Sequence, residues 1–147
     1  MFYFIDFPFT FNNLAFIVHL DSKVKNEDEL FKNLSDKLFF PDYFGYNWDA
    51  VYDLLRDFDW IKQEEIVLIY DAIPQLEEKT LRIFFQVLAT AISDWETGPR
   101  DNFHKLRVIF PTDSENSIKN LLKNEKTNIN RHSGTNFFQC IWSKFRV

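Results

Sequence analysis

Glycine and cysteine are scarce in this chain of 147 residues, and each shortage argues against a class of protein. The three glycines, Gly45, Gly98 and Gly134, are too scattered to form a glycine-rich loop around a phosphate, which disfavours dinucleotide-binding folds and P-loop enzymes. Cys140 is the single cysteine, so no internal disulfide can form, as is usual in a reducing cytoplasm. The uncharged run 7–20 is too short and too polar to cross a bilayer. We therefore expect a cytoplasmic protein without a membrane anchor.

Side chains for metal binding and nucleophilic catalysis are also sparse. The histidines, His19, His104 and His132, have no Cys, Asp or Glu at a recognisable zinc spacing. We interpret His19, which lies in an apolar stretch, as a core histidine, and Cys140 as a small buried apolar residue. No serine-centred nucleophile motif is present. We expect no metal, no cofactor and no covalent catalysis.

Aromatic residues, in contrast, are abundant, with 18 Phe, 5 Tyr and 4 Trp making up 18% of the chain. The apolar share of 46% and the charged share of 27% are those of an ordinary globular protein. Charge is uneven, because residues 1–104 carry a net charge of −10 and residues 105–147 carry +5. An acidic surface disfavours the phosphate backbone of nucleic acids and favours a basic protein partner.

Short apolar segments alternate with segments of helical periodicity along the chain. Strands are predicted over residues 2–5, 14–20, 66–70, 106–110 and 137–142, and helices over 26–40, 47–58, 75–95 and 115–124. Strands separated by helices predict an α/β fold with a small, mainly parallel sheet covered by helices. We expect a single domain over 1–147, with its core at about 14–110 and residues 111–147 as a C-terminal extension that contains a flexible loop at 124–135.

The predicted helix after Asn47 carries a row of acidic side chains. Asn47 is a good N-cap, and one face of the helix is apolar, with Val51, Leu54, Leu55 and Phe58. Asp49, Asp53 and Asp57 recur every four residues on the opposite face, where like charges repel by a few tenths of a kcal/mol per pair. Such a row is consistent with an ordinary solvated helix face or with a surface kept for a partner.

Tyrosines surround these carboxylates. Tyr43 and Tyr46 lie in the preceding turn, which we predict to form around Pro41 and Gly45, and Tyr52 lies in the helix itself. Some aromatic residues of this segment must be core, and Trp48 is the first expected to be buried. Tyrosines mixed with carboxylates are typical of interface hot spots, where rings exclude water from charged contacts. The interface and the solvated face explain this pattern about equally well.

The run 40–53, FPDYFGYNWDAVYD, resembles the signature of the barstar family of intracellular inhibitors of the secreted ribonuclease barnase. In that family, a Pro-acid-Tyr-aromatic-Gly loop leads into an Asn-capped helix with two aspartates four residues apart. The matching residues are Pro41, Tyr43, Phe44, Gly45, Asn47, Asp49, Ala50 and Asp53. The order of strands and helices from 14 to 110 also follows the family, so the resemblance covers about two thirds of the chain.

The resemblance implies roles for individual residues. Asp53 would enter the nuclease active site at a phosphate position, Asp49 would bind a cation at its rim, and Tyr43 would pack on the catalytic histidine. Tyr52 stands where the family usually has Trp, and Thr90 falls at the place of a distal glutamate on the third helix. The basic extension has no counterpart in the family. These departures suggest a nuclease partner different from barnase.

The sequence thus predicts an immunity protein, without cofactor or catalytic activity, that occludes the active site of a basic, cytotoxic ribonuclease. Its expected contact residues are Tyr43, Tyr46, Asp49, Tyr52, Asp53 and Asp57, supported by Pro41, Gly45 and Asn47. Two alternatives stay open: a small hydrolase that uses Asp49 and Asp53 as paired carboxylates, and a barstar-like interaction module without a nuclease partner. A concave pocket around the carboxylates would favour the hydrolase, and an exposed ridge would favour the inhibitor.

Overall fold

A computed structural model describes residues 2–6, 14–99 and 103–123 of the chain. The elements follow in the order β1 (Phe2–Phe4), β2 (Ala15–His19), α1 (Glu27–Leu38), α2 (Trp48–Leu55), β3 (Glu65–Ile69), α3 (Glu78–Thr97), β4 (Lys105–Phe110), a 3-10 turn (Thr112–Ser114) and α4 (Glu115–Lys123). This order agrees with the predicted one to within a few residues at each end. The predicted loop 124–135 and strand 137–142 lie outside the described residues.

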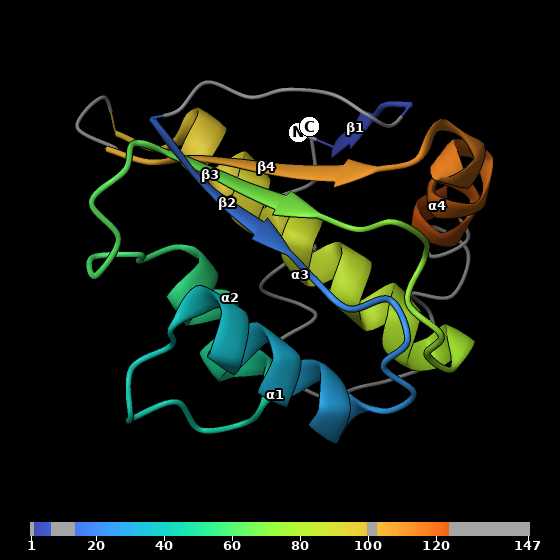
Figure 1. Ribbon diagram of the computed structural model, residues 1–147, viewed down its shortest axis with the longest axis horizontal. Helices are drawn as coiled ribbons and strands as arrows, with labels where there is room; N and C mark the ends of the chain where they lie inside the picture. Colours follow the sequence, from blue (N-terminus) through green and yellow to red (C-terminus); the bar gives the residue numbers. More distant parts are fainter. Residues whose placement is uncertain (1, 7–13, 100–102, 124–147) are drawn as a thin grey trace, which may run out of the picture.

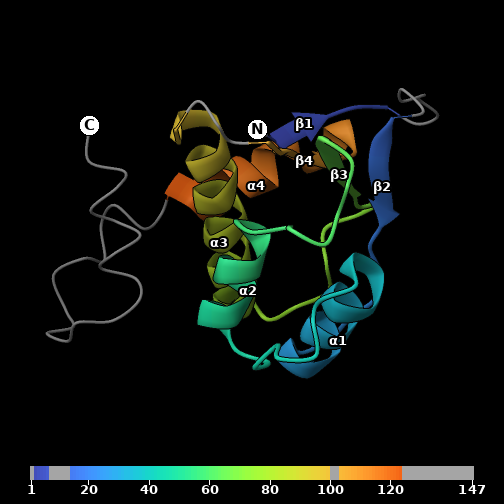
Figure 2. The ribbon, with the colours of Figure 1, turned by 90° about the vertical axis from the view of Figure 1, so that its left-hand side faces the viewer.

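The sheet is parallel throughout its described strands. Its strand order is β1–β4–β3–β2, and every adjacent pair is parallel. Helices α1, α2 and α3 lie together on one face of this sheet (Figures 1 and 2). The central strand β3 is an apolar run without alternation after Glu65, as expected for a strand buried on both faces, whereas β4 alternates at residues 105–108 before its buried end. The predicted α/β fold with a mainly parallel sheet is therefore confirmed.

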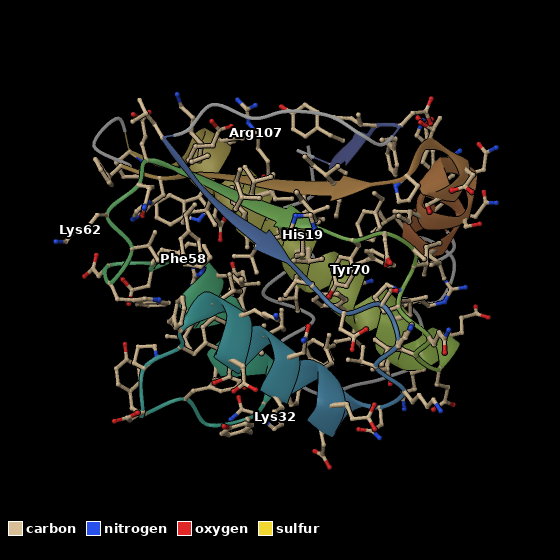
Figure 3. All side chains as sticks on the ribbon, viewed as in Figure 1. His19, Lys32, Phe58, Lys62, Tyr70 and Arg107 are labelled. Atoms are coloured by element: carbon tan, nitrogen blue, oxygen red, sulfur yellow. The ribbon has the colours of Figure 1, made fainter. Side chains whose placement is uncertain are left out.

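Aromatic rings fill much of the space between the sheet and α3. Tyr70, Phe84, Phe85 and Phe110 are fully buried. The ring of Tyr70, which is labelled in Figure 3, stacks on Phe110 with 5.2 Å between centroids and meets the edge of Phe84 at 6.2 Å. Burial raises the pKa of the Tyr70 hydroxyl above its ordinary value because the charged form would lose its hydration. Most phenylalanines among the described residues thus belong to the core, whereas Phe39 and Phe103 are exposed.

The structure reverses the expectation for His19. His19 lies on the edge strand β2 and is exposed, whereas its neighbour Val18 is buried. The reason is the alternation of side chains along a strand, which points successive residues to opposite faces of the sheet. Of the two histidines in the described residues, His104 is the buried one; its Nδ1 lies 2.9 Å from the Gln63 carbonyl oxygen, and its ring meets Trp95 at 5.4 Å.

Two negative findings apply to the described residues 2–6, 14–99 and 103–123. No helix there combines the length and the apolar character needed to pass through a bilayer. No three side chains of the His, Cys, Asp or Glu type are grouped there in a way that could hold a metal ion.

Candidate partner-binding surface

The turn between α1 and α2 is anchored by one buried ring. Phe44 is 6% exposed and packs edge-on against Phe40 with 4.9 Å between centroids. Its backbone N–H donates to the Pro41 carbonyl at 2.9 Å, which closes the turn. On either side of this anchor, Tyr43 is 72% exposed and Tyr46 is 58% exposed. The turn therefore presents two tyrosine rings to solvent from a fixed base.

Close contacts connect this turn to the start of α2. The Asn47 side-chain oxygen accepts a hydrogen bond from the Ala50 N–H at 2.9 Å, and its amide nitrogen donates to the Gly45 carbonyl at 3.1 Å. A Cβ atom at Gly45 would lie 2.9 Å from that amide nitrogen. Tyr46, not Gly45, adopts the left-handed conformation, with φ of 49°. Gly45 is thus needed for the close approach of the Asn47 cap.

Helix α2 buries one stripe and exposes two carboxylates. Val51, Leu54 and Leu55 are at most 4% exposed, as their spacing predicts. Asp49 and Asp53 are exposed on the other side, and the Asp53 side chain keeps 71% of its accessible area. We call the exposed side chains of Tyr43, Tyr46, Asp49 and Asp53 the Tyr–Asp surface.

Asp57 does not extend this surface along the helix, which corrects the predicted three-residue row. The helix ends at Leu55, three residues earlier than expected. Phe58 turns into the left-handed region with φ of 52°, and its ring is fully buried. Asp57 is therefore half-buried beyond the end of α2, where it lines a different hollow together with Asp59. Burial of Phe58 overrides the local preference for a longer helix.

Tyr52, which was predicted to contact the partner, is buried in the structure. Only 8% of its area is accessible, and its hydroxyl donates to Asp94 Oδ2 at 2.5 Å. The Arg56 guanidinium covers the ring, with its carbon 4.0 Å from the ring centroid. Burial, followed by the hydrogen bond to Asp94, raises the pKa of the Tyr52 hydroxyl above its ordinary value. Tyr52 thus packs beneath the exposed face of α2 and connects this helix to Asp94.

Sequence reasoning missed Asp94, which lies on α3. Thr90, the position aligned with a distal glutamate, is 1% exposed, and its hydroxyl donates to the Gln86 carbonyl at 2.8 Å. Thr90 therefore provides no surface contact. Asp94 follows it by one helical turn and brings a carboxylate next to α2. The four-residue spacing from Thr90 to Asp94 was the signal that could have identified this residue.

Arg56 joins the two helices at this point. Its Nη2 lies 3.0 Å from Asp53 Oδ1, and its Nη1 lies 3.4 Å from Asp94 Oδ2. Between residues 40 and 61, Arg56 is the only basic residue, against five aspartates at 42, 49, 53, 57 and 59. The region is therefore strongly acidic, with one internal cation at its edge.

Trp48 stiffens the start of α2 without being fully buried. Its ring meets the edge of Phe31 at 4.9 Å and lies 6.2 Å from Phe84. Its indole N–H donates to Glu27 Oε1 in α1. Trp48 thus connects α2 to both α1 and α3. It is half-buried, whereas the sequence predicted that it would be buried.

Comparison with known families identifies this architecture. The family model described as Barstar (barnase inhibitor) matches residues 15–111. The chain belongs to the barstar family. The match runs from the first residue of β2 to the residue after β4, so it includes the turn, α2 and α3. None of the curated proteins matches this barstar-family chain.

Family membership makes this a ribonuclease-inhibitor-like protein, from a family of inhibitors rather than enzymes. The geometry around α2 agrees with a contact surface. Asp49 and Asp53 project from an exposed helix face, whereas paired catalytic carboxylates are held in a cleft. A rigid helix with two outward carboxylates and two flanking tyrosines is suited to bind a cationic protein surface.

Proposed function

We propose that this protein is the cytoplasmic immunity partner of a basic, cytotoxic ribonuclease and that its Tyr–Asp surface occludes the nuclease active site. Asp53 would take the position of a substrate phosphate, and Asp49 would meet a cation at the rim. Tyr43 and Tyr46 would pack around these charges. The observation that carries the proposal is the exposure of the two carboxylates beside two exposed tyrosines, in a chain of an inhibitor family.

The physical reason lies in the chemistry of ribonucleases. A nuclease gathers cationic side chains to bind the phosphate and to stabilise charge in the transition state. Carboxylates on a rigid helix pair with those cations through charge-assisted hydrogen bonds and leave no space for the substrate. The cap at Asn47 and the buried stripe beneath α2 hold the carboxylates in place before binding, which lowers the entropic cost of association.

The hydrolase alternative is less well supported. A carboxylic acid that donates a proton near neutral pH needs a water-poor pocket that raises its pKa. The Asp53 side chain is 71% exposed and therefore lacks the water-poor surroundings that such a role requires.

The decisive experiment measures inhibition and binding of the nuclease encoded beside this gene, with barnase as a second target. Purified protein should block RNA cleavage, and Asp53→Ala and Asp49→Ala should each weaken binding by more than about tenfold. Asp113→Ala is the matched control, because it removes an exposed carboxylate from the 3-10 turn after β4. Association should slow steeply as salt rises.

Two outcomes would contradict the proposal in different ways. If the wild-type protein neither binds nor inhibits the nucleases, the fold serves as an interaction module for another partner. If it inhibits them but Asp49→Ala and Asp53→Ala bind as tightly as Asp113→Ala, then another surface makes the contact.

A further inference from the structure

Arg56 already occupies the cation position between two carboxylates in the free protein. Its guanidinium lies between Asp53 and Asp94, at 3.0 Å and 3.4 Å, and over the face of Tyr52 at 4.0 Å. These are the groups that a cationic side chain of a partner would seek on this surface. The free protein thus contains an internal substitute for part of its partner.

The hydrogen bonds that hold the Arg56 guanidinium are few and partly long. Only the contact with Asp53 is within ordinary hydrogen-bond distance, and the contact with Asp94 is long. The Arg56 Nε is buried without a hydrogen-bond partner among the described residues. The Asp53 carboxylate is mostly exposed, and exposed ion pairs contribute little to stability. An incoming cation therefore has to replace one exposed hydrogen bond to Asp53, a long contact with Asp94 and the contact of Arg56 with the Tyr52 ring.

The structure also provides space for the displaced side chain. Arg56 lines two hollows at the end of α2, one of about 290 Å³ beside Asp94 and Trp95, and one of about 590 Å³. The larger hollow contains Asp57 and Asp59, which offer the guanidinium a second pair of carboxylates. A rotation about the Arg56 side-chain bonds would bring the guanidinium from Asp53 toward Asp57 and Asp59, which line the same hollow.

We propose that Arg56 is an internal competitor that neutralises Asp53 in the free protein and is displaced toward Asp57 and Asp59 when a partner cation binds. This inference rests on the proposed function, since it concerns the same surface. Arg56 would lower the affinity for any cationic partner and set a threshold. Only a partner whose cation reaches Asp53 with better geometry than Arg56 would bind tightly.

Three variants test this inference. Arg56→Gln removes the charge and keeps much of the side chain, and Arg56→Lys keeps the charge. Lys62→Gln is the matched control: Lys62 lines the same hollow, its removal changes the net charge equally, and it projects from the connection between α2 and β3 (Figure 3). Thermal unfolding verifies that each variant is folded before binding is measured.

Binding to the nuclease should strengthen by about 3- to 10-fold in Arg56→Gln relative to Lys62→Gln, mainly through faster association at low salt. Arg56→Lys should stay within about twofold of the wild-type protein, because its charge still competes. Weaker binding by Arg56→Gln, or binding equal to that of Lys62→Gln, would overturn the inference and make Arg56 a positive contributor or a bystander.

A measurement without the nuclease separates this inference from the proposed function. A hexa-arginine peptide is titrated into each isotope-labelled variant, and the amide resonances of Asp53 and Asp94 are followed. We expect the peptide to bind Arg56→Gln several-fold more tightly than Lys62→Gln, with shifts at both aspartates. Equal affinities would refute competition by Arg56 even if the nuclease is inhibited. Tighter peptide binding together with no nuclease binding would support the competitor and refute the proposed function.

Discussion

The two ends of α2 carry the same kinds of side chain, tyrosine and aspartate, in different surroundings. At the N-terminal end, Tyr46 and Asp49 face solvent beside a capped turn. At the C-terminal end, Tyr52 is buried, and its hydroxyl and Arg56 both contact Asp94 of α3 (Figure 2 shows α2 beside α3). The N-terminal end belongs to the candidate contact surface, whereas the C-terminal end presents Asp53 and also joins α2 to α3.

The difference follows from where α3 passes. Helix α3 packs against α2 and supplies Asp94 and Trp95, whose indole N–H donates to the Leu55 carbonyl at 2.8 Å. A tyrosine beneath that helix becomes structural, whereas a tyrosine beyond its reach stays available to a partner. Residue type alone therefore does not mark the contact surface. The following substitutions test this contrast, in order of decreasing expected effect.

The buried stripe beneath α2 should give the largest loss of stability. Leu55→Ala removes a fully buried side chain, and the free energy of unfolding should fall by about 2–5 kcal/mol through lost apolar burial and the cavity left behind. Urea unfolding measures it, with Asp49→Ala as the control on the exposed face, expected within about 0.5 kcal/mol of the wild type. A large loss in Asp49→Ala would show that the exposed face is structural.

The same substitution at two tyrosines compares the two ends directly. Tyr52→Phe should lower the free energy of unfolding by about 1–2 kcal/mol, because the Asp94 carboxylate loses a hydrogen bond in a partly buried site. Tyr46→Phe should change it by less than about 0.5 kcal/mol, since Tyr46 is exposed. Equal losses of unfolding free energy would mean that packing against α3 does not make Tyr52 more important for stability than Tyr46.

Alkaline pH should sharpen that comparison. The pKa of Tyr52 is raised in the folded state, so its contribution to stability is complete below the unfolded value of about 10 and is lost as the pH rises above it. The stability difference between the wild type and Tyr52→Phe should therefore be constant from about pH 7 to 9 and shrink above about pH 10. A difference that grows above that pH would contradict the raised pKa.

The cap of α2 should have an intermediate effect. Asn47→Ala should cost about 1 kcal/mol of unfolding free energy, because the Ala50 N–H loses its acceptor. Asn26→Ala is the matched control, since Asn26 caps α1 in the same way through the Glu29 N–H at 2.9 Å. Both should lower the midpoint of urea unfolding similarly, but only Asn47→Ala should weaken nuclease binding. Similar losses of binding in both variants would point to a general effect of stability.

Gly45→Ala should have the smallest effect, with a loss below about 1 kcal/mol, because the added Cβ displaces the Asn47 amide while alanine restricts the unfolded chain. The double variant with Asn47→Ala should be non-additive. Once the amide is absent, Gly45→Ala should become neutral or slightly stabilising. Additive losses in urea unfolding would show that Gly45 matters for another reason.

Much of the fold was predictable because its signals are local. The cap at Asn26 and the helical spacing after it indicated α1, and the apolar run before Asp71 indicated the buried strand β3. The signature at 40–53 indicated both the family and the two exposed aspartates. Each of these inferences depends on residues close to one another in the chain.

The errors share a cause of another kind. The early end of α2 and the burial of Tyr52 both depend on elements distant in the sequence. Phe58 leaves the helix to join the core, and its ring lies 6.5 Å from Trp95 and 6.1 Å from His104. No periodicity around residue 58 encodes those neighbours.

The sequence by itself determined the order of helices and strands, the caps and the presence of an acidic pair on an aromatic-rich helix, because hydrogen bonding and side-chain spacing within an element are short-range. Only the tertiary structure decided which tyrosines stay exposed, that Asp94 joins the acidic region, and that Arg56 lies between two carboxylates. Those outcomes depend on which distant element excludes water from a side chain, and burial of that kind exists only after the chain has packed.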